Sequence, residues 1–132
     1  MKKEFDKIGK CNVFHNLSES VDFHDTCKTL LMRMLYRKNK KALIYSEYHP
    51  LRENKVYPDV LMYLGKHFYV FELQSAYSDS WLKQLQEKYE MDDNTTLIPI
   101  NLNKIKMEWS ARINESGDPL EVLKKILEDY VI

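Results

Sequence analysis

The sequence predicts a single α/β domain in which a mixed central sheet of about four strands is flanked by helices. Apolar residues recur at helical spacing in some segments and alternate with polar residues in others. The two kinds of segment follow one another in the order helix, three strands, helix, strand, helix. With 132 residues, of which 44% are hydrophobic, the chain has enough apolar surface for one core. No repeat, low-complexity stretch or linker divides it, so we expect one domain over residues 1–132.

The first helix is predicted over about 22–40. Either Ser20 or Asp22 can serve as its N-cap, and Lys40 and Lys41 follow at its end. The apolar positions that recur at helical spacing are Phe23, Cys27, Leu30, Leu31, Met34 and Leu35. They give the helix one apolar side, which we expect to lie against the sheet.

Three strands come next. The first is predicted over 42–48, and 49–55 is predicted to be a loop because Pro50 resists helix. Over 60–71 the residues first alternate and then become aromatic or β-branched, with a turn at 64–67. We therefore expect a tight antiparallel hairpin whose second strand is buried.

A second helix and a fourth strand follow the hairpin. Ser78 can cap a helix that runs through Tyr89. Residues 96–100 read as a strand, and Pro99 predicts that this strand lies at an edge of the sheet, because proline cannot donate to a central ladder.

The C-terminal part of the chain predicts one further helix. Residues 103–116 fit no single pattern and are left open. Gly117-Asp118-Pro119 then starts a helix that runs to about 131, since proline is favoured in the first helical turn. Its apolar stripe consists of Leu120, Val122, Leu123, Ile126, Leu127 and Tyr130.

Charge and composition exclude several general roles. Twenty basic and twenty acidic residues cancel, so any attraction to nucleic acid, to an anionic membrane or to an acidic partner must be local. No apolar run reaches the roughly 18 residues of a membrane span, and the charged start lacks the apolar stretch of a secretion signal. Two cysteines, Cys11 and Cys27, are too few for a disulfide framework. We expect a cytoplasmic protein with no membrane partner.

Two acidic residues stand at one end of the predicted hairpin. Asp59 begins the first of its strands and Glu72 lies near the end of the second, so antiparallel pairing brings them together. Two carboxylates in mostly apolar surroundings are costly unless a positive charge lies between them. A divalent cation would satisfy both.

The same residues form a pattern that resembles a known superfamily. Pro58-Asp59, a gap of twelve residues and Glu72-Leu73-Gln74 fall within an α-β-β-β-α-β order over roughly residues 20–101. This arrangement resembles the PD-(D/E)xK nuclease superfamily. It is most similar to the competence-protein CoiA-like nucleases, whose pattern is matched by His24, Lys28, Glu47, Asp59 and Glu72-Leu73-Gln74-Ser75. The chain departs from the superfamily at Gln74, where a lysine is usual, and from the family at Tyr57, where an arginine often precedes Pro-Asp.

The resemblance implies a restriction-endonuclease-like core and a DNA nuclease that uses Mg²⁺ or Mn²⁺, in DNA processing or recombination. Such a cation accepts a few carboxylates and keeps several waters, and it activates water for phosphodiester hydrolysis. Asp59, Glu72 and the backbone carbonyl of Leu73 are its expected ligands. Glu47 is expected either to bind the metal or to position the water.

Three further polar residues are candidates for catalysis. Gln74 shares a strand face with Glu72 and can donate a hydrogen bond to water or phosphate. His24 and Lys28 are four residues apart on one helix face. We expect Lys28 to supply the positive charge that Gln74 cannot. The alternative is that His24 and Lys28 form the solvated side of an amphipathic helix and that Gln74 is a satisfied polar residue.

Basic residues of the first helix are candidates for binding DNA. Lys28, Arg33, Arg37, Lys38, Lys40 and Lys41 come within fourteen residues that contain no acid. They can follow a phosphate backbone. Alternatively, they form a solvated helix face, on which positive charges near the C-terminus interact favourably with the helix dipole. The sequence does not decide whether the protein forms a homodimer.

Two other functions compete with nuclease activity. A nuclease-fold domain can bind nucleic acid or a protein without cutting, which the glutamine at position 74 allows. The spacings Cys11-x3-His15 and His24-x2-Cys27 also suit tetrahedral zinc in a small interaction protein. Because Cys27 falls on the apolar stripe of the helix, burial explains it better than metal binding.

Overall fold

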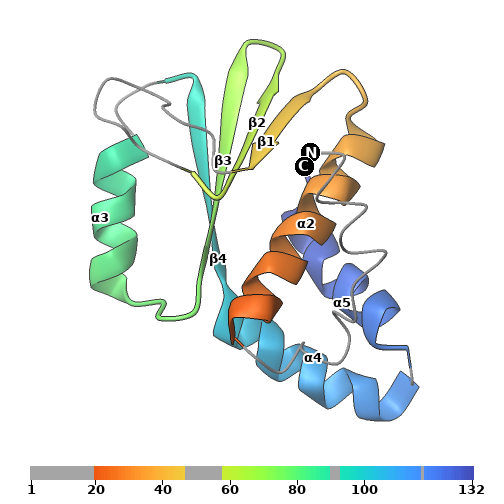
Figure 1. Ribbon diagram of the computed structural model, residues 1–132. Helices are drawn as coiled ribbons and strands as arrows, with labels where there is room; N and C mark the ends of the chain where they lie inside the picture. The colour runs from red at the N-terminus through yellow and green to blue at the C-terminus, as the bar shows by residue number, and fades with distance from the viewer. Residues whose placement is uncertain (1–19, 47–57, 90–92, 117) are drawn as a thin grey trace.

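The computed structural model describes residues 20–46, 58–89, 93–116 and 118–132. Its centre is a four-stranded sheet in the order β1-β2-β3-β4, with helices on both faces (Figure 1). The strands are β1 Leu43–Ser46, β2 Val60–Leu64, β3 His67–Gln74 and β4 Thr95–Asn101. The first three pair antiparallel, whereas β3 and β4 pair parallel. The predicted α/β class and mixed sheet are confirmed, and β4 lies at an edge as its proline predicted.

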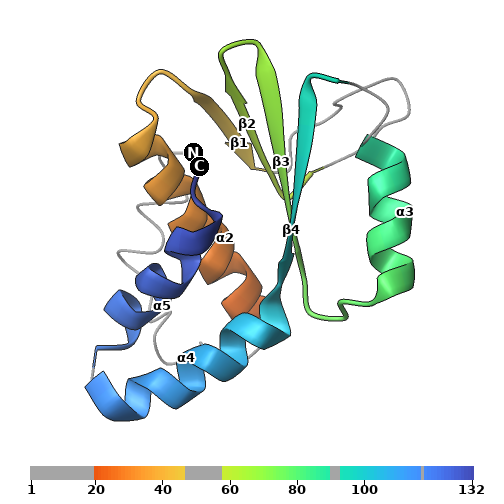
Figure 2. The ribbon, with the colours of Figure 1, turned by 180° about the vertical axis from the view of Figure 1, so that it is seen from behind.

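The helices form two unequal layers (Figures 1 and 2). One face of the sheet carries α3, and the other side of the molecule holds α2, α4 and α5. The helix bounds are α2 Ser20–Lys38, α3 Asp79–Tyr89, α4 Leu102–Ser116 and α5 Pro119–Leu127. A 3₁₀ turn, η2 Glu128–Tyr130, follows α5. The segment that the sequence left open is therefore α4. In the described residues no helix is long and apolar enough to cross a membrane.

Side-chain alternation along the strands divides the core between the two faces. On the α2 side, Val60, Met62, Phe71 and Leu73 join the larger cluster with the helices of that layer. On the α3 side, a smaller cluster contains Leu61, Val70, Leu85 and Tyr89. Because residues two apart share a face, Glu72 and Gln74 point to the same side as Val70, which is the α3 side.

The β2–β3 hairpin fixes the register on which the site depends. Its turn is Gly65-Lys66, and both residues have positive φ, 59° and 64°. Two-residue turns of this kind match the twist of antiparallel strands. Val60 pairs with Phe71, so Asp59, one residue before β2, stands opposite Glu72.

The second and last helices start at their predicted caps, whereas the first does not: α2 begins at Ser20, so both of its predicted caps, Ser20 and Asp22, lie within the helix. The ends of the first and last helices also differ from prediction. The Ser78 hydroxyl accepts a hydrogen bond from Trp81 N–H at 3.1 Å, and Asp118 accepts one from Leu120 N–H at 3.2 Å. The first helix ends at Lys38 rather than near residue 40. Asn39 terminates it, because its side-chain amide bonds Leu35 O and its carbonyl accepts Ala42 N–H in a turn. The last helix likewise ends before 131, because residues 128–130 tighten into the 3₁₀ turn.

Candidate active site

The centre of the candidate site is the carboxylate pair Asp59 and Glu72. The two carboxyl groups lie close enough for each to shift the pKa of the other. Asp59 Oδ2 also accepts the backbone N–H of Leu73 at 2.9 Å, which ties the start of β2 to the end of β3. In an extended strand the N–H and C=O of one residue point to the same side. The carbonyl of Leu73 is therefore on the side of β3 that faces Asp59.

The environment separates the two carboxyl groups electrostatically. Burial raises the pKa of Glu72 to about 8, and the negative charge of Asp59 adds to this effect. Burial also acts to raise the pKa of Asp59, but His24, the N–H of Leu73 and the carboxyl of Glu72 outweigh it and hold that pKa below its ordinary value. At neutral pH the metal-free pair therefore keeps one proton, on Glu72, and one negative charge, on Asp59.

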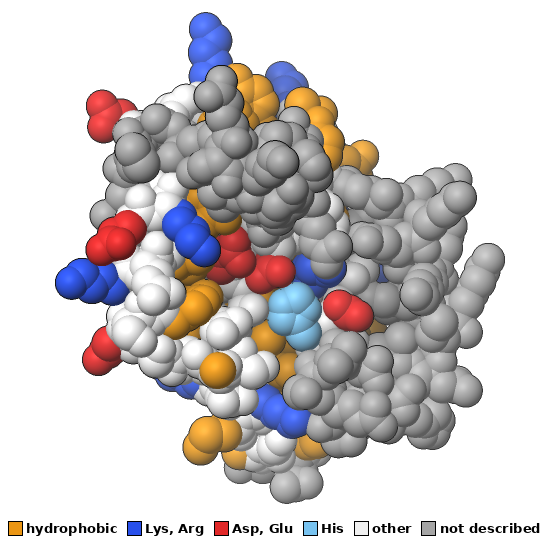
Figure 3. Space-filling view, turned by 60° about the vertical axis from the view of Figure 1, so that its left-hand side comes forward, with side chains coloured by type: hydrophobic (Ala, Val, Ile, Leu, Met, Phe, Trp, Pro, Cys, Tyr) orange, Lys and Arg blue, Asp and Glu red, His pale blue; other side chains and the backbone are white. Residues whose placement is uncertain are grey.

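His24 and Lys28 approach the pair from α2. His24 Nε2 lies 3.7 Å from Asp59 Oδ1, and His24 Nδ1 lies 3.5 Å from Asp25 Oδ1. The Asp59 carboxylate raises the pKa of His24, while burial and the charge of Lys28 oppose this. Figure 3 shows a histidine among acidic side chains on the surface that comes forward when the α3 side is turned to the viewer.

Lys28 is buried, with 7% of its side chain exposed, and its ammonium is 4.0 Å from Asp25 Oδ1. It therefore does not lie on the solvated side of α2. A buried ammonium needs anionic partners, and Lys28 is held beside His24 by their four-residue spacing. The structure thus brings Lys28 and His24 together beside Asp25, and His24 in turn lies next to Asp59.

Tyr89 is a site residue that sequence reasoning missed. Its hydroxyl donates a hydrogen bond to Glu72 Oε1 at 2.8 Å, and the residue is 1% exposed. The sequence predicted that the second helix runs through Tyr89 but assigned its hydroxyl no partner. A buried tyrosine hydroxyl usually needs a polar partner, and this rule could have pointed to a contact with a residue such as Glu72.

The other predicted site residues are Gln74, Glu47 and the basic residues of α2. Gln74 ends β3 on the same face as Glu72 and stands opposite Asn101 of β4. Glu47 lies outside the described residues. Arg33, Arg37 and Lys38 are exposed along α2, separately from the buried Lys28.

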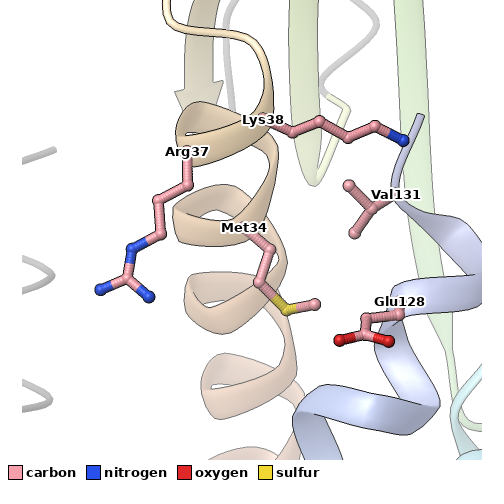
Figure 4. A pocket seen from close by; sticks show the side chains of 5 residues that line it. All are labelled: Met34, Arg37, Lys38, Glu128 and Val131. Atoms are coloured by element: carbon pink, nitrogen blue, oxygen red, sulfur yellow. The ribbon is translucent and has the colours of Figure 1, made fainter.

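Arg37 and Lys38 lie at the end of α2 that is far from the carboxylate pair. Thirteen residues separate Arg37 from His24, which corresponds to about 20 Å along a helix. With Met34, Glu128 and Val131 they line an open pocket. In Figure 4 Lys38 extends towards Val131, whereas Arg37 points away from it.

The donor set suits a hard cation better than zinc. Two carboxylates and a carbonyl are oxygen ligands, and Mg²⁺ or Mn²⁺ would complete its shell with water. Within the described part of the chain no group of three or more His, Cys, Asp or Glu side chains could hold a metal. Cys27 is fully buried in the larger core, where burial raises the pKa of its thiol, and this confirms that it is a core residue. Cys11 and His15 lie outside the described residues.

Comparison with known proteins gives no relative for this site. Scans of family models, of curated proteins and of solved structures each found no match.

Proposed function

We propose that this chain is a divalent-metal-dependent nuclease that hydrolyses phosphodiester bonds in DNA. The observation that carries the proposal is the half-buried pair Asp59 and Glu72, in which the pKa of Glu72 is raised to about 8. Such a pair is unfavourable without a positive charge, and perturbed carboxylates at a sheet end are typical of functional sites. The resemblance of the motif to PD-(D/E)xK nucleases supports the same conclusion.

The residues present have distinct roles in this proposal. Asp59, Glu72 and the Leu73 carbonyl would hold Mg²⁺ or Mn²⁺, with Glu47 as an additional ligand or a residue that positions water. When bound, the cation would activate water and neutralise charge on the scissile phosphate. The N–H of Leu73 holds Asp59 in place through its 2.9 Å hydrogen bond.

Positive charge on the substrate side would come from α2 rather than from β3. Lys28 would carry the charge that a lysine usually supplies at the position of Gln74, and His24 would hold Asp59 from the same helix. Gln74 would donate a hydrogen bond to the attacking water or to the phosphate. Arg33, Arg37 and Lys38 would contact the DNA backbone further along α2.

Binding without cleavage is the second candidate, and one observation favours it. Lys28 lies near the carboxyl of Asp25, so part of its charge is already compensated inside the protein. A site in which Gln74 replaces lysine and Lys28 is engaged elsewhere would bind DNA without hydrolysing it. The zinc alternative depends on Cys27, whose burial in the core disfavours it.

A cleavage assay separates these candidates. Purified protein is incubated with single-stranded and double-stranded DNA in Mg²⁺, in Mn²⁺ and in EDTA. Asp59→Asn is expected to lower the cleavage rate by at least about a hundredfold while DNA affinity in EDTA changes by only a few-fold. Asp129→Asn, which changes an exposed aspartate of η2, is the matched control and should cleave like the wild type. Metal-independent cleavage, or binding with no cleavage in either metal, would contradict the nuclease proposal.

A further inference from the structure

The hydrogen bond between Tyr89 and Glu72 joins α3 to the carboxylate pair. Tyr89 is the last residue of α3, and its ring belongs to the smaller core with Leu61, Val70 and Leu85. Its hydroxyl donates to Glu72 Oε1 at 2.8 Å. Because the ring is 1% exposed and packed on all sides, the position of the hydroxyl is fixed by the core.

A fixed donor restricts how the Glu72 carboxylate can turn. The bond engages Oε1 and leaves the second oxygen of the carboxylate for another partner. In the metal-free protein Glu72 also interacts with the carboxyl of Asp59. A cation would replace the proton of that pair, whereas the neutral phenol can donate to the carboxylate with or without a cation.

The two carboxylates are thus supported from opposite faces of the sheet. His24 of α2 lies 3.7 Å from Asp59, and Tyr89 of α3 lies 2.8 Å from Glu72. Outer-shell hydrogen bonds of this kind orient metal ligands.

We infer that Tyr89 is a positioning residue of the metal site: its hydroxyl holds Glu72 by Oε1 so that the second carboxylate oxygen is presented to the cation. The inference rests on the proposed metal-dependent function. It assigns to α3 a direct part in building the site, in addition to its packing on the sheet.

Tyr89→Phe tests this inference, because it keeps the ring and removes only the hydroxyl. The readout is the dissociation constant for Mn²⁺, measured on the full chain from the EPR signal of free Mn²⁺. We expect affinity to fall by about 10- to 100-fold, the usual cost of losing an outer-shell partner. Tyr63→Phe is the matched control, because it removes a hydroxyl from the far end of the same sheet face and should leave the affinity unchanged.

A double-mutant cycle with Glu72→Gln shows whether Tyr89 acts through Glu72. If it does, Tyr89→Phe should weaken Mn²⁺ binding in the wild type and have little further effect in the Gln background. The wild-type protein gives a second measurement that needs no folded variant at position 89. Mg²⁺ binding should produce a tyrosine ultraviolet difference spectrum, which Asp59→Asn should abolish.

The outcomes distinguish the inference from the proposed function. If the wild type binds no Mn²⁺, the metal-dependent function fails and the inference fails with it. If the wild type binds Mn²⁺ and Tyr89→Phe binds it equally well, only the inference is overturned. Metal binding with no tyrosine difference spectrum also overturns the inference alone.

Discussion

Replacing Glu72 with Gln should make the metal-free protein more stable than the wild type at alkaline pH. Burial and Asp59 raise the pKa of Glu72 from 4.5 to about 8. Between these values the unfolded chain has lost the Glu72 proton and the folded chain still holds it, so the free energy of unfolding falls as pH rises. This loss of stability is absent below pH 4.5 and complete above pH 8. At about 1.4 kcal/mol per pH unit it amounts to at most about 5 kcal/mol.

Urea unfolding in EDTA from pH 4 to 9 measures this effect. The amide of Gln mimics the protonated acid, because it can still accept from Tyr89 and donate to Asp59. Glu72→Gln should therefore match the wild type at about pH 4 and exceed it by a few kcal/mol near pH 9. Glu128→Gln, at an exposed carboxylate of η2, is the control and should follow the wild type.

His24 also makes the free energy of unfolding fall as pH rises, and the Glu72→Gln variant keeps this contribution. Its folded pKa is raised, so its stabilisation is full below 6.5 and is lost as pH rises through the folded value. The wild-type curve should therefore fall more steeply than the Glu72→Gln curve, and the Gln curve should still fall above 6.5. Parallel curves over the whole range would refute the assignment of a raised pKa to Glu72.

Three further predictions concern metal, DNA and charge. A divalent cation should raise the melting temperature of the wild type, because it binds the folded state, and Mn²⁺ should do so more than Mg²⁺. At a hundredfold excess over Kd the stabilisation should be about 2.7 kcal/mol. Calorimetry should show no such shift for Asp59→Ala, and a retained shift would remove Asp59 from the site. Charge reversal at Arg37 and Lys38 should weaken DNA binding and flatten its salt dependence in anisotropy titrations, whereas an unchanged slope would make this end of α2 a solvated face. In a cleavage assay Lys28→Ala should cost more activity than Gln74→Ala, and Gln74→Lys should partly rescue Lys28→Ala. Additive losses without rescue would refute the role given to Lys28.

Local patterns were sufficient for most of the fold. Ser78 and Asp118 marked helix starts because their side chains cap backbone N–H groups within the next turn. The sequence did not predict α4, because no proline or glycine separates the end of β4 from the start of the helix. Asn101, the last residue of β4, accepts a hydrogen bond from Lys104 N–H at 3.2 Å, so one residue both ends the strand and caps the helix.

The site divides in the same way between local and long-range information. Antiparallel pairing about Gly65-Lys66 was enough to place Asp59 opposite Glu72, because register in a hairpin follows from its turn. The approach of His24 and Lys28 depends on how α2 packs, and only the resemblance suggested it. The contact of Tyr89 with Glu72 joins residues seventeen apart across a helix–sheet interface, and no local pattern specifies that distance.

The unequal helical layers have a consequence for hydrogen exchange in the native protein. The α3 layer is held by a small cluster around Leu85 and Tyr89, whereas α2, α4 and α5 share a much larger core. Elements with few buried contacts open at lower free energy than the whole protein. Amides of α3 should therefore exchange through a partial opening that leaves the larger core intact. Each such opening would separate Tyr89 from Glu72 while Asp59 keeps its bond to Leu73, so α3 exchange rates would report how often the site is disassembled.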